Sequence, residues 1–218
     1  MTTTFDRLLD PTPTDRETGW VRMPDGTLVV NVRTDMYKVT GAAFAWWFAS
    51  HPGDREYKWW HPIDHMSSSW IGNTHVVVEA LTKLPATDLS VQFEEPAGYF
   101  TPGAYDAAMA DGRVSVVMAA RAGAAYEESV GPDGLVRGGR ILHVGRDTPW
   151  GMALRSHFRL GLDLVDMGMP PEKIAEIFPD AIGPNLLQHC YDEFRFLADV
   201  LPAMYAAEGD GPKPPRPW

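Results

Sequence analysis

Residues 185–207, NLLQHCYDEFRFLADVLPAMYAA, form the longest helix-like stretch of the sequence. At about 100° per residue, its apolar side chains fall on one face, and Asp192, Arg195 and Asp199 fall on the opposite face. The apolar face consists of Leu186, Cys190, Leu197, Val200, Leu201 and Met204. This pattern predicts an amphipathic helix that buries one side, with Pro202 as a point where it can kink.

The sequence before this helix has the spacing of an antiparallel sheet, because short strand-like runs alternate with turns. Helices are predicted after Thr40, a plausible N-cap, and from Pro170 to before Pro179. Strands are predicted at 27–32, 74–80, 89–95, 113–120, 124–130, 138–145 and 151–160, with a hairpin turn at 131–134, GPDG. These elements predict an α+β fold in which a curved antiparallel sheet wraps around the last helix.

Composition excludes several classes of partner. The chain has 218 residues and a net charge of -10, which disfavours nucleic acid and anionic membranes. A single cysteine, Cys190, excludes an intrachain disulfide and indicates a reducing compartment. The N-terminus lacks a secretory signal, and no apolar run reaches the roughly 18 residues of a membrane span. We therefore expect a cytoplasmic protein.

Two residues interrupt the apolar face of the last helix. Glu193 lies near its centre, and His189 lies one turn earlier towards one side. A carboxylate that faces a core must be paired, protonated or bound to a metal. An imidazole and a carboxylate at this spacing suit a single metal ion, whereas the alternative is an ion pair with Arg155 or Arg159.

A second group of chemically active residues lies at 57–65, YKWWHPIDH, on a predicted loop. His61, Asp64 and His65 fall within five residues and are flanked by Tyr and Trp. Such a segment favours ligand binding, although a packed aromatic turn is the alternative. Trp47, Trp59 and Trp60 are candidates for the flat walls of a pocket, and Trp47 also fits an ordinary core position.

Two strands carry candidate acidic ligands. In LSVQFEEP, 89–96, Leu89, Val91 and Phe93 alternate, and the same period places Glu95 on their face. A slip or bulge would replace Glu95 by Glu94. In the strand at 74–79, His75 and Glu79 share a face and are reserve ligands. Together with His189 and Glu193, one such Glu and one His from 57–65 would make a two-His, two-carboxylate site suited to Zn²⁺.

The sequence resembles the 2,4-diacetylphloroglucinol hydrolase and phloretin hydrolase family. The resemblance rests on YKWWHPIDH at 57–65, FEEP at 93–96 and HCYDE at 189–193, with looser support from 151–161, and it spans roughly residues 35–208. It implies a Bet v 1-like helix-grip fold and a bound Zn²⁺. It also implies hydrolysis of a carbon–carbon bond between a polyhydroxylated aromatic ring and an acyl group. We accordingly expect a lead-in at 1–34, a catalytic domain at 35–208 and a Pro-rich tail at 209–218.

The resemblance also assigns roles to individual residues. It implies His65, Glu95, His189 and Glu193 as metal ligands. It favours His65 over His61 because the family's ligand His follows a substrate-binding Tyr by eight residues, as His65 follows Tyr57. Ser68 occupies the position of a substrate-contacting Asn. His61 is then a candidate for supporting the ligands or transferring protons.

The implied reaction is a retro-Claisen hydrolysis. Zn²⁺ would polarise the acyl carbonyl and lower the pKa of bound water, and the hydroxylated ring would leave as a stabilised enolate. Tyr57 would bind a ring hydroxyl, and Glu95 would move protons. The expected partner is a small aromatic polyphenol ketone, and a homodimer is left open.

Three other functions fit parts of the sequence. A metal-free helix-grip binding protein or cyclase of aromatic polyketide metabolism would use the same fold. A non-haem iron oxygenase would use two His and one carboxylate, and a fourth protein ligand disfavours it. A purely structural protein leaves two inward-facing acidic residues unexplained.

Overall fold

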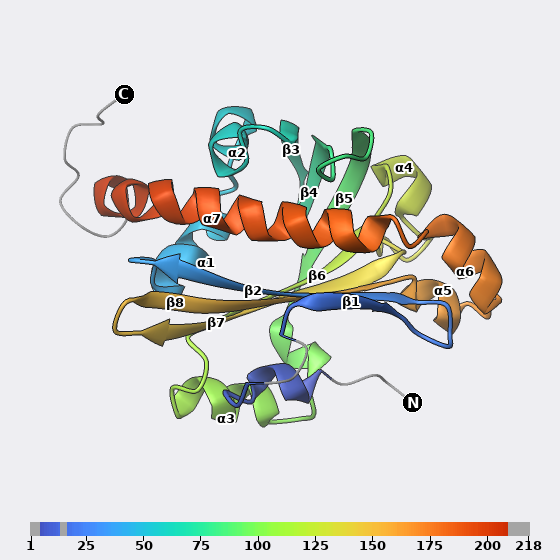
Figure 1. The fold of residues 1–218 in the computed structure, drawn as a ribbon. Coiled ribbons are helices and arrows are strands. Elements are labelled where there is room, and N and C mark those ends of the chain that lie inside the picture. Colours follow the sequence, from blue (N-terminus) through green and yellow to red (C-terminus); the bar gives the residue numbers. More distant parts are fainter. Residues whose placement is uncertain (1–4, 14–16, 209–218) are drawn as a thin grey trace.

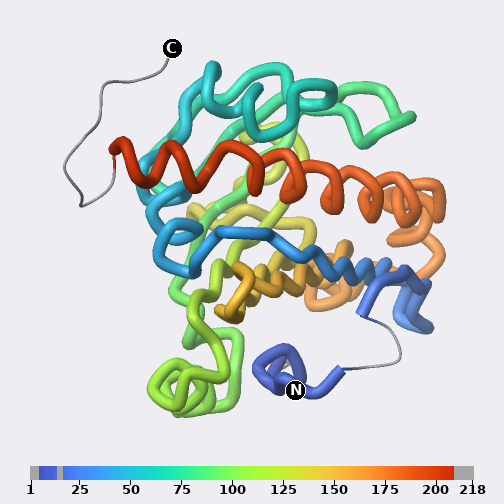
Figure 2. Tube along the Cα trace, turned by 60° about the vertical axis from the view of Figure 1, so that its left-hand side comes forward, coloured from blue at the N-terminus to red at the C-terminus, as the bar shows by residue number. Residues whose placement is uncertain are grey.

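The computed structural model describes residues 5–13 and 17–208. An eight-stranded sheet curves around one long helix, α7 (Ile182–Glu208), which lies across its inner face (Figures 1 and 2). Every strand pair is antiparallel, in the order β1-β2-β8-β7-β6-β5-β4-β3. The predicted α+β class, with a curved antiparallel sheet around the C-terminal helix, is confirmed.

The strands are β1 (Gly19–Arg22), β2 (Leu28–Tyr37), β3 (His65–Ile71), β4 (Thr74–Glu79), β5 (Thr87–Glu94), β6 (Val116–Gly123), β7 (Gly139–Thr148) and β8 (Gly151–Leu160). The shorter helices are η1 (Asp6–Leu9), α1 (Gly41–Ala49), α2 (Asp54–Trp60), η2 (Pro96–Tyr99), α3 (Ala104–Ala110), α4 (Tyr126–Ser129), α5 (Leu162–Asp166) and α6 (Pro171–Ile177). In Figure 1, α1, α2 and α7 lie on one side of the sheet, while η1 and α3 lie on the other.

Apolar side chains on the two faces of the sheet form two cores. The larger core lies between the sheet and α7, and Phe194, Leu197 and Leu201 of α7 are fully buried in it. The smaller core joins η1, η2 and α3 to the outer face through Phe5, Tyr99 and Ala108. Because apolar side chains are buried on both faces, the sheet is held firmly between the two cores. Side chains on its inner face therefore point at α7 from defined positions.

Several local predictions are confirmed. Thr40 caps α1, because its Oγ accepts a hydrogen bond from the Ala43 amide at 3.2 Å. The strand at 151–160 has the predicted bounds. The helix expected at 185–207 extends over 182–208 with Pro202 inside it. The GPDG turn is present, although it closes an isolated antiparallel bridge between Val130 and Val136 and does not join two strands.

Other local predictions are wrong or shifted. Residues 124–130 contain the helical turn α4 in place of a strand, since Glu127 and Glu128 are poor strand formers and favour a helix N-terminus. The predicted loop at 57–65 contains the last residues of α2 and the first of β3. The expected boundary at 34/35 falls inside β2, so β1 and most of β2 in the expected lead-in belong to the sheet, while η1 packs on its outer face. The tail at 209–218 lies outside the described residues.

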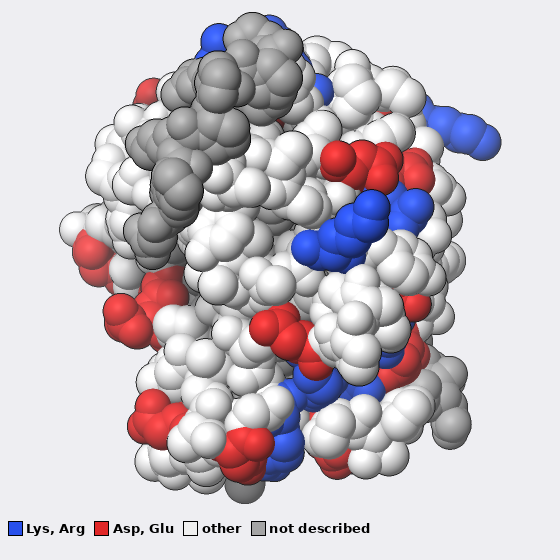
Figure 3. Space-filling model, turned by 90° about the vertical axis from the view of Figure 1, so that its left-hand side faces the viewer, with Lys and Arg blue, Asp and Glu red and all other residues white. Residues whose placement is uncertain are grey.

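The described surface carries charges of both signs. On the face shown in Figure 3, Lys and Arg lie beside Asp and Glu and do not gather into a basic block. Within residues 5–13 and 17–208, no helix is both long enough and apolar enough to cross a membrane.

Candidate metal centre

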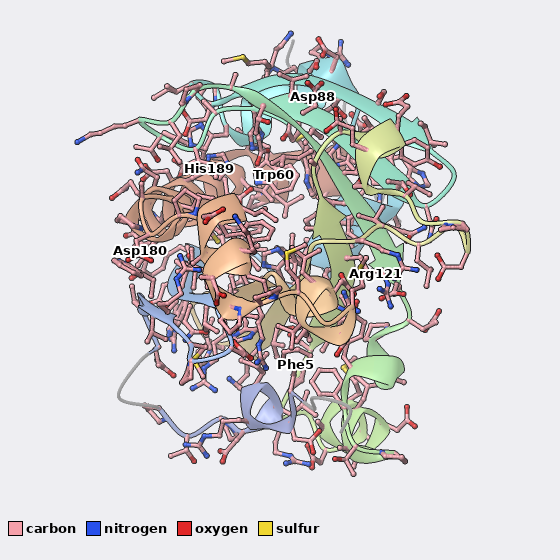
Figure 4. All side chains as sticks on the ribbon, turned by 90° about the vertical axis from the view of Figure 1, so that its right-hand side faces the viewer. Phe5, Trp60, Asp88, Arg121, Asp180 and His189 are labelled. Atoms are coloured by element: carbon pink, nitrogen blue, oxygen red, sulfur yellow. The ribbon has the colours of Figure 1, made fainter. Side chains whose placement is uncertain are left out.

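Four elements meet at one end of the inner core. Helix α2 contributes Tyr57, its C-cap residue is His61, and His65 begins β3. Glu79, the last residue of β4, is the cross-strand partner of His65. Helix α7 adds His189 and Glu193, one turn apart. Figure 4 shows His189 and Trp60 on the same side of the interior, where α7 and α2 approach each other.

The side-chain atoms of this group converge. His65 Nε2 lies 3.6 Å from Glu79 Oε2 and 3.9 Å from Glu193 Oε2. His189 Nε2 lies 3.7 Å from Glu79 Oε1. These separations exceed hydrogen-bond length and are close to the roughly 3.4 Å between ligand atoms of a tetrahedral zinc ion. His65, Glu79 and His189 each offer an atom within 4.8 Å of the others.

Hydrogen bonds fix which nitrogen each of the two histidines presents to the centre. His65 Nδ1 donates to the Tyr57 carbonyl at 2.9 Å, and His189 Nδ1 donates to Asp64 Oδ2 at 3.0 Å. The Nε2 atom of each ring is therefore unprotonated in the neutral form and faces the carboxylates. His65 Nε2 is buried without a hydrogen-bond partner. Carboxylate or carbonyl oxygens commonly orient metal-binding histidines in this way.

His61 has the opposite tautomer. Its Nδ1 accepts a hydrogen bond from the Asp64 amide at 3.1 Å, so its proton sits on Nε2. That Nε2 lies 3.5 Å from Asp64 Oδ2, and the ring stacks on His189 with centroids 4.9 Å apart. His61, Asp64 and His189 also cluster closely enough to hold an ion. However, the protonated Nε2 of His61 is a donor, which makes His61 a support for Asp64 and His189.

Burial keeps the His65 imidazole neutral and opposes ionisation of Glu193. Burial, followed by the nearby His189, lowers the pKa of His65 to about 2. Burial, followed by the charge of Glu79, raises the pKa of Glu193 well above its usual range. Neutral imidazole is the metal-binding form. The two close carboxylates repel each other, and a cation between them would remove this cost.

Tyr57 connects the imidazole and carboxylate groups. Its ring is 1% exposed and stacks on His65, with centroids 3.7 Å apart and planes 7° apart. Its hydroxyl donates to Glu79 Oε2. Burial, followed by the charge of Glu79, raises the pKa of Tyr57 well above its usual value, so the phenol stays protonated and can donate this bond. Tyr57 therefore holds both His65 and Glu79 in place.

A cavity opens beside these groups, between α7 and the sheet. Tyr57, Glu79, His189 and Glu193 lie in its lining at one end. The remaining walls are mainly apolar and aromatic, and include Phe48, Trp60, Phe93, Met118, Ile141 and Phe158. A flat apolar ligand with a polar group at one end matches this arrangement.

Comparison with known proteins places the chain in a family. The model of the DAPG hydrolase PhiG domain, in which DAPG denotes 2,4-diacetylphloroglucinol, matches residues 2–206. The chain belongs to the DAPG hydrolase family. It is a hydrolase, as the sequence predicted.

Two named hydrolases agree with this assignment. A 2,4-diacetylphloroglucinol hydrolase of a Pseudomonas species is 25% identical over 233 residues, covering 94% of this chain and 76% of that protein. A phloretin hydrolase of Eubacterium ramulus is 27% identical over 207 residues, covering 85% of this chain and 70% of that protein. Among solved structures, norcoclaurine synthase from Thalictrum flavum aligns over 85% of this chain and 92% of its own with a TM-score of 0.45 and 12% identity.

Within this DAPG hydrolase family member, the structure brings together most of the expected site residues and leaves Glu95 out. Tyr57, His61, His65, His189 and Glu193 all belong to the cluster. Glu95 is exposed and precedes η2. Glu94 accepts from Arg121 Nε at 2.8 Å and from the Tyr99 hydroxyl at 2.5 Å on the outer side of the sheet. The second carboxylate in the cluster is Glu79, which the sequence offered as a reserve ligand.

The direction of β5 explains the displacement of Glu95. Glu79 pairs with Thr87 at the start of β5, whereas Glu95 follows the other end of that strand. The eight residues of extended chain from Thr87 to Glu95 span a length of roughly 25 Å. The alternation of side chains identified the inward face of β5, but it did not locate a residue along the sheet. Glu79 lies on the same face of its strand as His75 and Val77. His75 and Val77 line the cavity together with Glu79.

The remaining candidates occupy other positions. Ser68 lies behind the cavity wall, where its Oγ is 2.7 Å from His75 Nε2 and donates to the Pro52 carbonyl at 2.9 Å. Arg155 pairs with Glu17, and Arg159 Nη2 pairs with Asp25 at 2.6 Å. Neither arginine therefore compensates Glu193. Trp60 lines the cavity, and Trp47 is a core residue.

Proposed function

We propose that this protein hydrolyses the carbon–carbon bond between a polyhydroxylated aromatic ring and an acyl group, using a divalent metal ion. The proposed ion is Zn²⁺, held by His65 and His189 through Nε2 and by Glu79 and Glu193. The substrate class is the acylphloroglucinols, because the relatives are named as hydrolases of 2,4-diacetylphloroglucinol and phloretin. The convergence of two oriented imidazoles on one buried and one partly buried carboxylate carries the proposal.

The donor atoms fit the ion. His65 Nε2 is buried and has no hydrogen-bond partner, which is costly without a ligand. Glu79 and Glu193 supply negative charge to the same point. Four ligands of this kind suit zinc, whereas iron oxygenases generally use two His and one carboxylate and leave more positions open. When bound, such an ion supplies polarisation of the acyl carbonyl and a lower pKa of bound water.

The residues of the chain orient the substrate and the metal ligands, and they exclude water from the cavity. The apolar walls hold the ring and exclude water from it. Asp64 and the Tyr57 carbonyl keep both Nε2 atoms pointed at the centre. Tyr57 holds Glu79 in place through the hydrogen bond that its hydroxyl donates. The acyl carbonyl would lie at the polar end of the cavity, with the ring extending towards β7 and β8.

The hydroxylated ring makes the cleavage feasible. Hydrolysis breaks the ring–acyl bond, transfers water's oxygen to the acyl carbon and leaves the electron pair on the ring carbon, which then takes a proton. Hydroxyls meta to one another on the ring allow a keto tautomer, so this electron pair is held as an enolate. A ring without these hydroxyls would leave as an unstabilised carbanion. We therefore expect acylphloroglucinols to be cleaved and acetophenone to be inert.

The test compares two glutamates. Glu79→Gln should lower bound zinc and the hydrolysis rate of monoacetylphloroglucinol by at least about tenfold, because a neutral amide is a poor zinc ligand. Glu95→Gln is the matched control and should retain both properties, since Glu95 is exposed. Zinc is measured by inductively coupled plasma mass spectrometry and hydrolysis by release of phloroglucinol.

Normal zinc and activity in Glu79→Gln, with both lost in Glu95→Gln, would reverse the ligand assignment. A wild-type protein that binds no metal when zinc is supplied would contradict the metal centre. It would favour the metal-free binding protein or cyclase.

A further inference from the structure

Thr82 lies in the loop between β4 and β5 and has a backbone conformation that branched side chains avoid. Its φ is 57°. Three described residues other than glycine have a positive φ, and Thr82 is the one whose side chain is branched at Cβ. The Cβ atom crowds the backbone in this conformation, so the conformation is costly and persists only where the surrounding structure holds it.

The strained residue is part of a tight turn. The Leu84 amide donates to the Leu81 carbonyl at 3.0 Å, so residues 81–84 form a β-turn with Thr82 as its second residue. Of the two central residues, Thr82 has a positive φ and Lys83 does not. This combination defines a type II′ turn, in which glycine usually occupies the position of Thr82. The turn therefore keeps, at the cost of strain, a side chain that glycine would lack.

Three hydrogen bonds connect this turn to two other segments of the chain. The Thr82 amide donates to Asp64 Oδ2 at 3.0 Å, in the segment between α2 and β3. The Thr82 hydroxyl donates to the Asn185 carbonyl of α7 at 3.2 Å. The next amide, of Lys83, donates to the Asn185 side-chain oxygen at 3.1 Å. Of these three bonds, the one from the hydroxyl requires the side chain of Thr82.

The segments joined by the turn lead to two of the proposed ligands. Asp64 Oδ2 also accepts a hydrogen bond from His189 Nδ1 at 3.0 Å. Asn185 precedes His189 by one turn of α7. Glu79 ends β4, three residues before Thr82. The turn therefore lies where the chain leaving Glu79 meets both the helix that carries His189 and the carboxylate that orients it.

We propose that Thr82 is a positioning residue of the candidate metal centre. Its strained turn clamps α7 to Asp64 and to the end of β4, and its hydroxyl makes a bond to α7 that glycine could not make. The clamp holds His189 and Glu79 in register with each other before an ion binds. The inference deepens the proposed function and rests on it, because it takes the cluster to be a metal site.

The first test measures zinc affinity by competition with a chromophoric chelator. Thr82→Val keeps the branched shape and loses the hydroxyl, so zinc should bind about tenfold more weakly, as is common when a residue that supports a metal ligand is changed. Thr82→Ser keeps the hydroxyl and should restore the wild-type affinity. Thr87→Val is the matched control and should bind zinc as the wild type does, because Thr87 is exposed at the start of β5.

The second test separates positioning from a purely structural role. Thr82→Gly also lacks the hydroxyl but relieves the strain, so it should unfold at a higher urea concentration than Thr82→Val. Zinc affinity should nevertheless be lowered in both variants, since neither has a side chain that can bond to Asn185. If Thr82→Gly regains the wild-type zinc affinity together with stability, Thr82 has a structural role alone and the inference is overturned.

The third test asks whether the clamp is closed without an ion. In the metal-free wild-type protein, hydrogen exchange followed by NMR should show protected Thr82 and Lys83 amides, because both donate hydrogen bonds. Thr82→Val should accelerate exchange of the Lys83 amide. Amides that exchange freely in the metal-free wild type, and become protected after zinc is added, would show that the ion orders the turn and would overturn the inference.

These measurements distinguish failure of the clamp from failure of the proposed function. Equal zinc affinity in wild type, Thr82→Val and Thr82→Gly overturns the role of Thr82 even if zinc-dependent hydrolysis is found. If zinc affinity depends on the Thr82 hydroxyl while acylphloroglucinols are not cleaved, the clamp is supported and the proposed reaction fails. A wild-type protein that binds no zinc contradicts both.

Discussion

Asp64 shows how a single residue prepares the candidate metal centre. Its Oδ2 accepts from His189 Nδ1 at 3.0 Å and from the Thr82 amide at 3.0 Å. The backbone bond fixes the carboxylate, and the carboxylate fixes the imidazole. Since Asp64 is 5% exposed, water competes little for these bonds. The orientation of His189 is therefore set before any ion binds.

We predict that Asp64→Asn weakens zinc binding about 10- to 100-fold, because the amide keeps one acceptor but loses the charge that makes His189 a better donor to metal. The dissociation constant is measured by competition with a chromophoric chelator. Asp199→Asn is the control, since Asp199 is exposed on the same helix. Equal zinc affinity in the two variants would remove Asp64 from the support of the centre.

At the scale of elements, α1 and α7 enclose the cavity from the side opposite the sheet. Phe44 of α1 packs against Phe194 of α7, with centroids 5.6 Å apart, and Phe48 of α1 lines the cavity. The N-terminus of α1 is fixed by the Thr40 cap and by the Gly41 amide, which donates to Asp147 Oδ1 at 2.7 Å. These bonds tie the start of α1 to the sheet.

We predict that Thr40→Ala lowers the free energy of unfolding by about 1 kcal/mol, because the Ala43 amide loses its acceptor. Thr40→Ser keeps the hydroxyl and should retain most of the stability. Urea denaturation followed by tryptophan fluorescence gives both values. A Ser variant as unstable as the Ala variant would show that the methyl group of Thr40, and not its hydroxyl, stabilises α1.

At the scale of the whole molecule, folding buries several histidines in the neutral form. Burial lowers the pKa of His143 to about 3. Burial, followed by the nearby Arg159 charge, lowers the pKa of His157 to about 4. In the unfolded chain both have a pKa near 6.5. The unfolded state therefore binds more protons below that pH, and acid favours unfolding.

We predict that the free energy of unfolding is highest above pH 6.5. For His157 it should fall by about 1.4 kcal/mol per pH unit as the pH decreases from 6.5 to 4. His157→Gln removes this contribution and should flatten the dependence in that window. Urea titrations at a series of pH values measure the slope. Equal slopes in wild type and variant would mean that His157 is not buried in its neutral form.

The sequence by itself determined the long helix, most of the strands and much of the chemistry. The period of residues 185–207 specified a buried helix face, and Glu193 on that face required a partner that a purely apolar core cannot give. The segment 57–65 showed two candidate histidines, His61 and His65, within five residues. Each of these inferences is local, because helix and strand periods fix which way neighbouring side chains point.

Tertiary structure decided which carboxylate completes the cluster and which imidazole nitrogen faces it. Glu79 and Glu95 both follow the inward period of their strands, but only pairing with β3 brings Glu79 beside His65. The tautomer of His61 depends on the Asp64 amide in the turn after α2, and the tautomer of His65 depends on the Tyr57 carbonyl within α2. Side-chain periodicity fixes a face, whereas position along a sheet depends on non-local strand pairing that no short stretch of sequence encodes.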